Sequence, residues 1–329
     1  MDELRHACAA VAARAHSVTV VTDAIPAYAA MLSAGLHAQP RAPQPAPASA
    51  EERGARAAYW LTMDAINFGS GWFPTLRKRD GLSGYNTIAR ALQARFDEHG
   101  AWSATALTAL DANTLAPVLG QDPDHELMTL YAASLRDLGE RVTADHGGSF
   151  AAVADMGAVA VADAPDAPGP SAVALARHLG AWPSFADVSR YDELTVPFLK
   201  RAQIAAADLH RAGVVRFADL HELTMFADNL VPHVLRLDGV LRFEAELVDR
   251  IDREELIVHG SPEEVEIRAC ALHAVELLVA AAPAPPAGVG GPADLATVTA
   301  AAIDQLLWQR GQQPHYKASP RHRSRCTAY

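Results

Sequence analysis

Cysteine is scarce in this chain: only Cys8, Cys270 and Cys326 occur among 329 residues. Thiols so few and so widely spaced exclude a disulfide framework and a zinc cluster built on cysteine pairs. Histidine is more frequent, with 14 residues, but none of them follows a His-Glu-x-x-His or comparable ligand spacing. The sequence therefore gives no support to metal catalysis, and we expect neither a metal nor an organic cofactor.

Long apolar runs and an excess of positive charge are also missing. No window approaches the roughly 20 apolar residues of a membrane span, and Met1-Asp-Glu-Leu-Arg5 lacks the basic start of a signal peptide. The formal net charge is −11, from 28 Lys plus Arg against 39 Asp plus Glu, whereas proteins that follow a polynucleotide carry a basic stripe. We expect a soluble, cytoplasmic protein that binds neither a membrane nor a long nucleic acid. The sequence leaves the oligomeric state open.

Glycine-rich phosphate loops are absent as well. Gly288-Val-Gly-Gly-Pro292 lacks the Lys-Ser/Thr that follows such a loop, which favours a flexible connection. Three stretches rich in Pro, Ala and Gly, near 39–50, 162–170 and 282–293, are typical of surface loops. Because no change of composition follows them, we expect loop excursions from one domain that spans residues 1–329.

What the chain does have is helical periodicity. Its hydrophobic content of 50% is enough for a sizeable core. Two short pieces, Val18–Val21 and Leu256–Val258, could be extended, but nothing predicts a sheet large enough to organise the fold. We therefore expect an all-α protein. Apolar residues recur at three- and four-residue spacing over 2–15, 24–36, 52–67, 85–98, 125–144, 170–179, 194–212, 218–228, 232–240, 243–250, 262–281 and 294–310.

Asp228 stands at a break in this helical pattern. The apolar residues of 223–226 end at Asp228-Asn229, and a new periodic run starts at Pro232, a favoured first position of a helix. A carboxylate there lies near the positive end of a helix, which favours its ionised form. Such a charge suits stabilisation of a cationic transition state or orientation of a water. Asp and Asn are also standard capping residues, so from this segment alone capping is the better-supported interpretation.

Six segments considered together point further. They closely resemble segments of the queuosine salvage family, and they occur in the same order in that family as in this chain. Members of the family are queuosine 5′-phosphate N-glycosylase/hydrolases. The resemblance runs from near the N-terminus to the last residue. The segments are Asp64–Phe68, Gly84-Tyr85, Val196–Ile204, Glu222–Arg236, Glu264–Leu272 and Pro320–Tyr329.

The resemblance implies a fold similar to that of helix-hairpin-helix DNA glycosylases. It also implies cleavage of queuosine 5′-phosphate by water to queuine and ribose 5-phosphate, without a cofactor. The family's catalytic aspartate maps onto Asp228, which would stabilise an oxocarbenium-like sugar and orient water. The family's Lys-Arg-Ala-Gln motif makes Lys200 the preferred phosphate anchor, ahead of Arg201. An isolated Lys-Arg pair would otherwise be interpreted as a solvated basic surface.

Recognition of the base is expected from a second group of residues. Asp64 could receive the N–H donors on the guanine-like edge of queuine, while Phe68 or Trp72 could stack on the ring. A helix end with a buried aromatic is an equally good interpretation of this stretch. Tyr85 is a further stacking candidate, and Asn229 is a base-binding candidate beside the catalytic position.

Two departures from the family pattern leave alternatives open. This chain has Gly69-Ser70-Gly71-Trp72 where the family is rich in aromatic residues, and Asn229-Leu230 where many members have Tyr-Arg. The changes alter backbone freedom and remove one ring and one cation. A hydrolase of a different modified or 7-deazapurine nucleoside is therefore an alternative. A non-catalytic module that binds a nucleotide is another.

Overall fold

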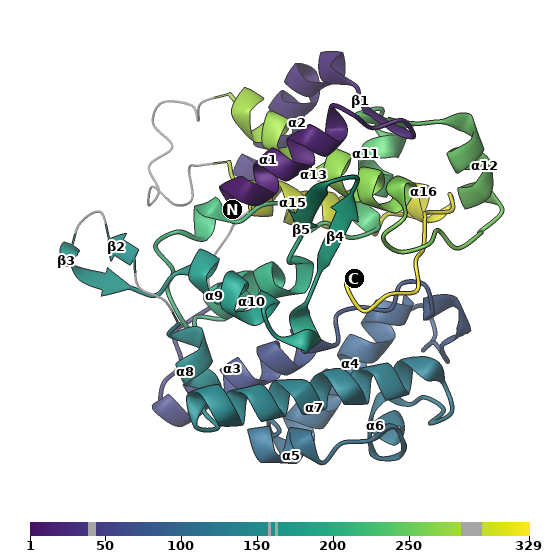
Figure 1. Cartoon of the computed structure of the whole chain (residues 1–329). Helices are drawn as coiled ribbons and strands as arrows, with labels where there is room; N and C mark the ends of the chain where they lie inside the picture. Colours follow the sequence, from purple (N-terminus) through teal and green to yellow (C-terminus); the bar gives the residue numbers. More distant parts are fainter. Residues whose placement is uncertain (39–43, 157–158, 162–163, 284–297) are drawn as a thin grey trace. The chain divides into compact units, whose positions relative to one another are not determined.

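The computed structural model describes residues 1–38, 44–156, 159–161, 164–283 and 298–329, with 159–161 and 164–168 described by their backbone alone (Figure 1). Most of these residues are helical, and the strands form three two-stranded antiparallel sheets. The helical class predicted from the sequence is confirmed, whereas similarity to helix-hairpin-helix glycosylases stays a prediction. Among the described residues, no helix combines the length and apolarity needed to cross a bilayer.

The chain divides into two compact units. The first unit comprises Met1–Ala42, Val188–Lys200 and His221–Arg325, and the second comprises Pro43–Asp187, Arg201–Leu220 and Cys326–Tyr329. Each unit is thus assembled from three separate segments of the chain. The expectation of a single domain stays a prediction.

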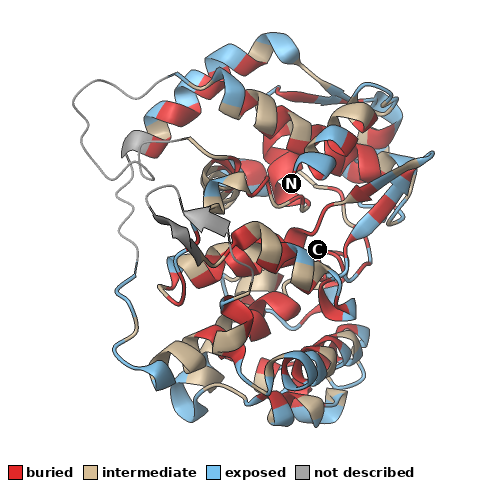
Figure 2. Cartoon of the chain, turned by 60° about the vertical axis from the view of Figure 1, so that its left-hand side comes forward, coloured by how far each residue is buried: buried red, intermediate tan, exposed pale blue. Residues whose placement is uncertain are grey.

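The first unit is built around α13 (Pro262–Ala281). This helix packs against α1 (Asp2–Ala12), α2 (Ile25–Ala38), α11 (Leu230–Leu237) and α15 (Ala300–Arg310). Most of its side chains are buried, as the colouring of Figure 2 shows, because neighbours cover it on several sides. The remaining elements are η1 (Thr22–Ala24), η4 (Leu220–Glu222), α12 (Ala245–Asp252), α16 (Pro314–Lys317) and the sheets β1 (Val18–Val20) with β6 (Leu241–Phe243) and β4 (Val188–Tyr191) with β5 (Leu194–Pro197).

The second unit is organised by the long helix α7 (Glu126–His146). It packs against α3 (Ala50–Ala65), α5 (Ala104–Thr108), α6 (Ala112–Leu119) and α8 (Phe150–Ala154). Gly139 permits the closest of these approaches, since a Cβ there would lie 2.5 Å from the carbonyl oxygen of Ala104. The unit also contains η2 (Phe73–Thr75), α4 (Gly84–His99), α9 (Ala172–Gly180), η3 (Pro183–Phe185), α10 (Lys200–Arg211), which begins at the boundary between the units, and the hairpin of β2 (Val159–Val161) and β3 (Ala164–Gly169).

Two predicted helices differ from the structure. The segment 218–228, expected to be helical, forms only the short turn η4, and residues 223–229 have no regular secondary structure. The helix expected over 194–212 begins at Lys200, because 194–197 is strand β5 and pairs with β4. Residue 199 then adopts a positive φ of 53° before the helix starts.

The predicted loops and extended pieces have mixed outcomes. Residues 44–49 are irregular and end at Ser49, whose Oγ accepts the N–H of Glu52 and caps α3. Part of the stretch expected as a loop near 162–170 is instead the strand β3, and 39–43 and 284–297 lie outside the described residues. The extended piece at Val18 is confirmed as β1, and Leu256 forms an isolated bridge with Arg323.

Candidate active site

The irregular segment 223–229 of the first unit is fixed by side chains from distant helices. The N–H of Phe226 donates to Oδ1 of Asp304 on α15 at 3.0 Å. The next carbonyl, of Ala227, accepts from Nε of Arg268 on α13 at 2.9 Å. These partners satisfy two backbone groups that a helix would otherwise have paired, in a segment that is mostly buried.

Asp228 follows this fixed stretch directly. Its Oδ1 accepts the N–H groups of Leu230 at 2.8 Å and Val231 at 3.1 Å, at the first turn of α11. The carboxylate is therefore a cap, placed at the positive end of the helix dipole. Its side chain is half-buried. Because the described residues place no hydrogen-bond donor on Oδ2, capping leaves one carboxylate oxygen available to a substrate or a water.

Asp304 is the second carboxyl group of this site. It is buried, with 6% of its surface exposed. Burial is the main cause that raises the pKa of Asp304 well above its usual range, and the negative charge of Asp228 raises it further. The Phe226 N–H and the charge of Lys200 act in the opposite direction. The surroundings of Asp304 therefore favour the protonated form of this carboxyl group.

Two cations complete the charge distribution around the carboxyl groups. Lys200, at the start of α10, is buried, and its charge acts on Asp304. Arg321, in the C-terminal segment, has its pKa lowered by burial and raised by the charge of Asp228. The first unit thus brings together Asp228, predicted as catalytic, and Lys200, predicted as the phosphate anchor.

Arg268 is itself held from three sides within the first unit. Its guanidinium lies over the ring of Phe198, 3.9 Å from the centroid, and 3.6 Å from the carboxylate of Glu264. Glu264 also accepts from the N–H of Gly260 at 3.0 Å and contacts His259. Burial works against its ionisation, but the contacts with His259 and Arg268 prevail and lower the pKa of Glu264 to about 2. Glu264 therefore stays ionised and keeps Arg268 in place.

The C-terminal segment is tied to α11. Asn229 is buried, and its Nδ2 donates to the carbonyl of His322 at 3.1 Å. On α11, Nε2 of His233 contacts the carbonyl of Tyr316 at 2.8 Å, and Arg236 donates to Pro320. Asn229, predicted to bind the base, thus uses its amide to fix the tail of the chain.

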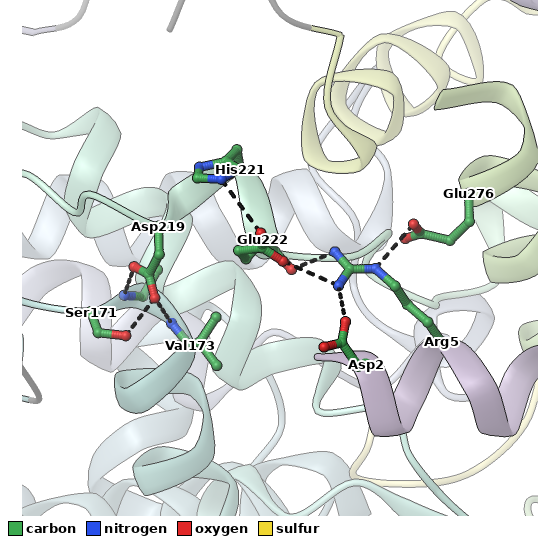
Figure 3. Close-up of polar contacts among 9 residues, drawn as sticks. Asp2, Arg5, Ser171, Val173, Asp219, His221, Glu222 and Glu276 are labelled. Atoms are coloured by element: carbon green, nitrogen blue, oxygen red, sulfur yellow. Dashed lines mark hydrogen bonds and ion pairs between the residues drawn. The ribbon is translucent and has the colours of Figure 1, made fainter. Parts of the chain in front are cut away.

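Helix α1 supports the start of the same segment (Figure 3). Arg5 donates to the carbonyl of Glu222 at 2.8 Å and pairs with the carboxylates of Asp2, Glu222 and Glu276. In the second unit, drawn in the same figure, Asp219 accepts from Ser171 and Val173 and so fixes the start of α9. Both clusters are structural ion or capping networks.

Arg201 lies in the core of the second unit. Only 1% of its surface is exposed. Its Nη1 donates to the carbonyl of Ala65 at 2.5 Å, and its guanidinium lies 4.8 Å from the ring of Phe68 and 5.5 Å from that of Phe185. Burial lowers the pKa of Arg201 to about 10. These contacts describe a cation that organises a core, although it was predicted to share phosphate binding.

The predicted base-binding residues other than Asn229 also belong to the second unit. Phe68 is buried and meets Tyr131 edge-on, with 5.0 Å between centroids. Trp72 donates through Nε1 to Glu126 at 2.7 Å. Asp64 is fully buried at the end of α3. Burial is the main cause that raises the pKa of Tyr85, and the charges of Asp208 and Asp64 raise it further. Asp64 and Tyr85 are thus electrostatically coupled, whereas Phe68 and Trp72 pack within the unit.

Gly69, one of the glycines that depart from the family pattern, has a structural reason. Gly69 adopts a φ of +111°, and a Cβ there would lie 2.8 Å from Leu127. Its N–H donates to the carbonyl of Tyr329 at 3.0 Å, and its carbonyl accepts from Trp72. The sequence change therefore creates a tight turn that only glycine fits easily and that receives the last residue of the chain.

No pattern in the sequence points to Asp304 or to the support by Arg268. Asp304 lies in an ordinary amphipathic helix, 78 residues beyond its partner Phe226. Arg268 matches the family motif, but its partner is a backbone carbonyl that no pattern reveals. Arg321 belongs to the segment Pro320–Tyr329 that resembles the family, but the resemblance implies no role for it.

Comparison with known proteins places this chain in a family. Residues 46–329 match the family described as queuosine salvage protein. A Sphaerobacter thermophilus protein named queuosine 5′-phosphate N-glycosylase/hydrolase is 36% identical over 286 residues, which cover 84% of this chain and 82% of that protein. Relatives with the same name from Mus musculus and Schizosaccharomyces pombe are 33% identical over 155 residues (45% of each chain) and 38% identical over 105 residues (31% of this chain and 30% of the relative).

By their names, these relatives are N-glycosyl hydrolases. The chain belongs to the queuosine salvage family, as the sequence motifs predicted.

Proposed function

We propose that this protein hydrolyses the N-glycosidic bond of queuosine 5′-phosphate and releases queuine and ribose 5-phosphate. The observation that carries the proposal is the geometry of Asp228 in a member of this family. One oxygen of its carboxylate is fixed by two N–H groups of α11, and the carboxylate is half-buried beside cations. Relatives whose names state this activity support the same assignment.

In the proposed reaction, Asp228 acts on the sugar and on water. As the glycosidic C–N bond breaks, its electron pair leaves with the base, and positive charge develops on the ribose. An ionised carboxylate in a site of low dielectric stabilises this charge. The free oxygen of Asp228 then accepts a proton from the water that adds to the anomeric carbon. The departed base takes up a proton from solvent, and Asp228 returns its proton to solvent, which completes the hydrolysis and restores the carboxylate. The fixed oxygen prevents the side chain from turning away.

Lys200 is the proposed phosphate anchor. Lys200 is buried, and its charge acts on Asp304. It belongs to the same unit as Asp228. Charge-assisted hydrogen bonds to phosphate are stronger than neutral ones. Arg201 is not retained in this role, because its guanidinium is packed against Phe68 in the core of the second unit.

Recognition of the base is proposed for Asp64 and Tyr85. A buried carboxylate accepts the paired N–H donors of a guanine-like edge, and a tyrosine offers a ring for stacking. Phe68 and Trp72 are not retained in this role, because the Phe68 ring lies against Tyr131 and Trp72 Nε1 donates to Glu126.

The substitution Asp228→Asn tests the catalytic assignment. The amide keeps an oxygen for the N–H groups of α11 but lacks the negative charge. We expect kcat for release of queuine, followed by chromatography, to fall by about 10²- to 10⁴-fold, while binding of queuosine 5′-phosphate by calorimetry stays within about threefold. Asp249→Asn, which changes an exposed carboxylate on α12, is the matched control. Turnover that survives in Asp228→Asn would remove Asp228 from the mechanism.

A panel of substrates separates the alternatives. Purified protein is incubated with queuosine 5′-phosphate, queuosine, other 7-deazapurine nucleotides and ordinary purine nucleotides. Release of a different base with higher kcat/KM would redirect the proposal to that substrate, which is a specific concern because the amide of Asn229 is engaged with His322. Binding without release of any base would identify a non-catalytic module.

A further inference from the structure

We propose that Asp304 is a positioning residue of the active site, which holds the segment before Asp228 by accepting the Phe226 N–H as an uncharged carboxylic acid. This inference rests on the proposed function, in which Asp228 is the charged group that meets the ribose. The hydrogen bond between Asp304 and Phe226 does not depend on which substrate the protein binds. Asp304 would be the neutral member of a pair of carboxyl groups and Asp228 the ionised member.

The geometry of Asp304 carries the first step. Its Oδ1 accepts from a backbone N–H only two residues before Asp228, at 3.0 Å. With the Arg268 bond to the Ala227 carbonyl, it fixes the two peptide groups that precede the catalytic residue. Catalytic groups need this kind of support, since small displacements from the productive geometry are costly.

Its surroundings decide the charge state. Only 6% of Asp304 is exposed, and it forms no ion pair with any residue in the described part of the chain. Buried carboxylates are normally paired, because an unpaired charge loses its hydration without compensation. The protonated form avoids this cost and still accepts the Phe226 N–H through its carbonyl oxygen.

The neighbouring charges reinforce this assignment. The charges that act most strongly on Asp304 are those of Asp228, which opposes its ionisation, and Lys200, which favours it. Burial and Asp228 prevail. The helices that pack against α15 carry further titratable groups, namely Tyr28 and His37 on α2, His233 and Arg236 on α11, and Glu263, Glu264, Glu266, Arg268, Cys270, His273 and Glu276 on α13. With Asp304 neutral, the charge of Asp228 acts on the cation Arg321 without a second negative charge beside it.

This assignment has a chemical consequence for the phosphate-bearing substrate. A second negative charge beside Asp228 would repel the phosphate and would compete for Lys200. Ionisation of Asp304 as pH rises should therefore raise KM for the nucleotide more than it lowers kcat. A neutral Asp304 lets the site carry one fixed negative charge without that repulsion.

Two substitutions separate a neutral acid from a charged one. Asp304→Asn keeps the carbonyl acceptor and is permanently neutral, so we expect its kcat at pH 7 to stay within about tenfold of the unmodified protein. The rise of KM with pH that we expect for the unmodified protein should be absent in Asp304→Asn. Asp304→Leu removes the acceptor, and we expect kcat to fall by about 10²-fold as Asp228 is displaced. A loss of kcat in Asp304→Asn as large as that in Asp228→Asn would overturn the proposal.

A measurement without turnover keeps the proposal testable if the proposed function fails. A group with a raised pKa in the folded state binds more protons when folded, so its contribution to stability is lost as pH rises through that pKa. The difference in Tm between Asp304→Asn and the unmodified protein should therefore grow with pH above about 4. Difference infrared spectra at pH 7 should show a carboxylic-acid C=O band that Asp304→Asn lacks and that Asp249→Asn retains. A pH-independent Tm difference without this band would refute the neutral acid, whatever the activity.

Discussion

Substitution of Lys200 tests whether the protein recognises the phosphate of its substrate. In the protein Lys200→Met, the apolar length of the side chain is kept and the charge is lost. We expect KM for queuosine 5′-phosphate to rise by about 10- to 100-fold, since hydrogen bonds to charged groups contribute about 1.5–3 kcal/mol. KM for the nucleoside queuosine should change little. Steady-state kinetics on both substrates measure the ratio.

The matched control is Lys317→Met, which removes an exposed lysine of α16. It should leave both KM values unchanged. Equal increases of KM for nucleotide and nucleoside in Lys200→Met would indicate that the lysine contributes to folding of the site rather than to phosphate binding.

Single residues differ in how far the sequence reveals them. Asp228 could be predicted because it interrupts an apolar pattern next to a helix start and lies in a family motif. Its capping bonds to Leu230 and Val231 agree with the simplest interpretation of that pattern, since capping uses one oxygen and leaves the other. Asp304 could not be predicted, because its importance comes from a contact with Phe226 and not from its own sequence context.

Helices with local signals were predicted well. For α13, Ser261 caps the first turn, Pro262 takes the first helical position, and the structure gives the expected bounds. The prediction of a helix over 218–228 was wrong for a physical reason. Its apolar spacing fits a helix, but Asp304 and Arg268, which are distant in sequence, form hydrogen bonds with its backbone. Local periodicity cannot register partners 41 and 78 residues away.

The attachment of the C-terminal segment to α11 should weaken in acid. Burial lowers the pKa of His233 to about 4 and that of His322 to about 3. The unfolded chain, with ordinary histidines, therefore binds more protons between pH 6.5 and these values, so stability falls as pH decreases through this window. At pH 5 we expect a loss on the order of 2 kcal/mol per histidine.

Thermal unfolding between pH 7.5 and 5 measures this effect. His322→Asn should show a shallower fall of Tm with decreasing pH, because the titrating ring is removed. The exposed His6→Asn serves as the control and should follow the unmodified protein. Identical slopes for all three proteins would show that His322 is not neutral in the folded state.

At the level of the entire chain, the family match leaves out the helices α1 and α2 of the first unit. The match begins at residue 46, yet α1 and α2 pack against α13 and bury side chains such as Leu4, Val11 and Leu32. A protein restricted to 46–329 would expose that face of α13. We expect it to lose cooperative unfolding, because each buried side chain of this size contributes about 1.5–3 kcal/mol.

Circular dichroism and calorimetry of the 46–329 protein check this expectation. Arg5→Met is a milder companion: it removes the contacts with Glu222 and Glu276 and should lower Tm without abolishing the transition. A shortened protein with an unchanged Tm would show that α1 and α2 are dispensable.

The contacts of Arg5 also bear on how the molecule is made. Glu222 and Glu276 follow Arg5 by 217 and 271 residues, so α1 leaves the ribosome long before its partners exist. Its apolar face, with Leu4, Cys8 and Val11, is uncovered throughout that interval. Contacts between residues so far apart in sequence form late, which slows folding and leaves apolar surface exposed to aggregation. Slower translation at low temperature, or an abundant holding chaperone, should therefore raise the yield of native enzyme from a recombinant host.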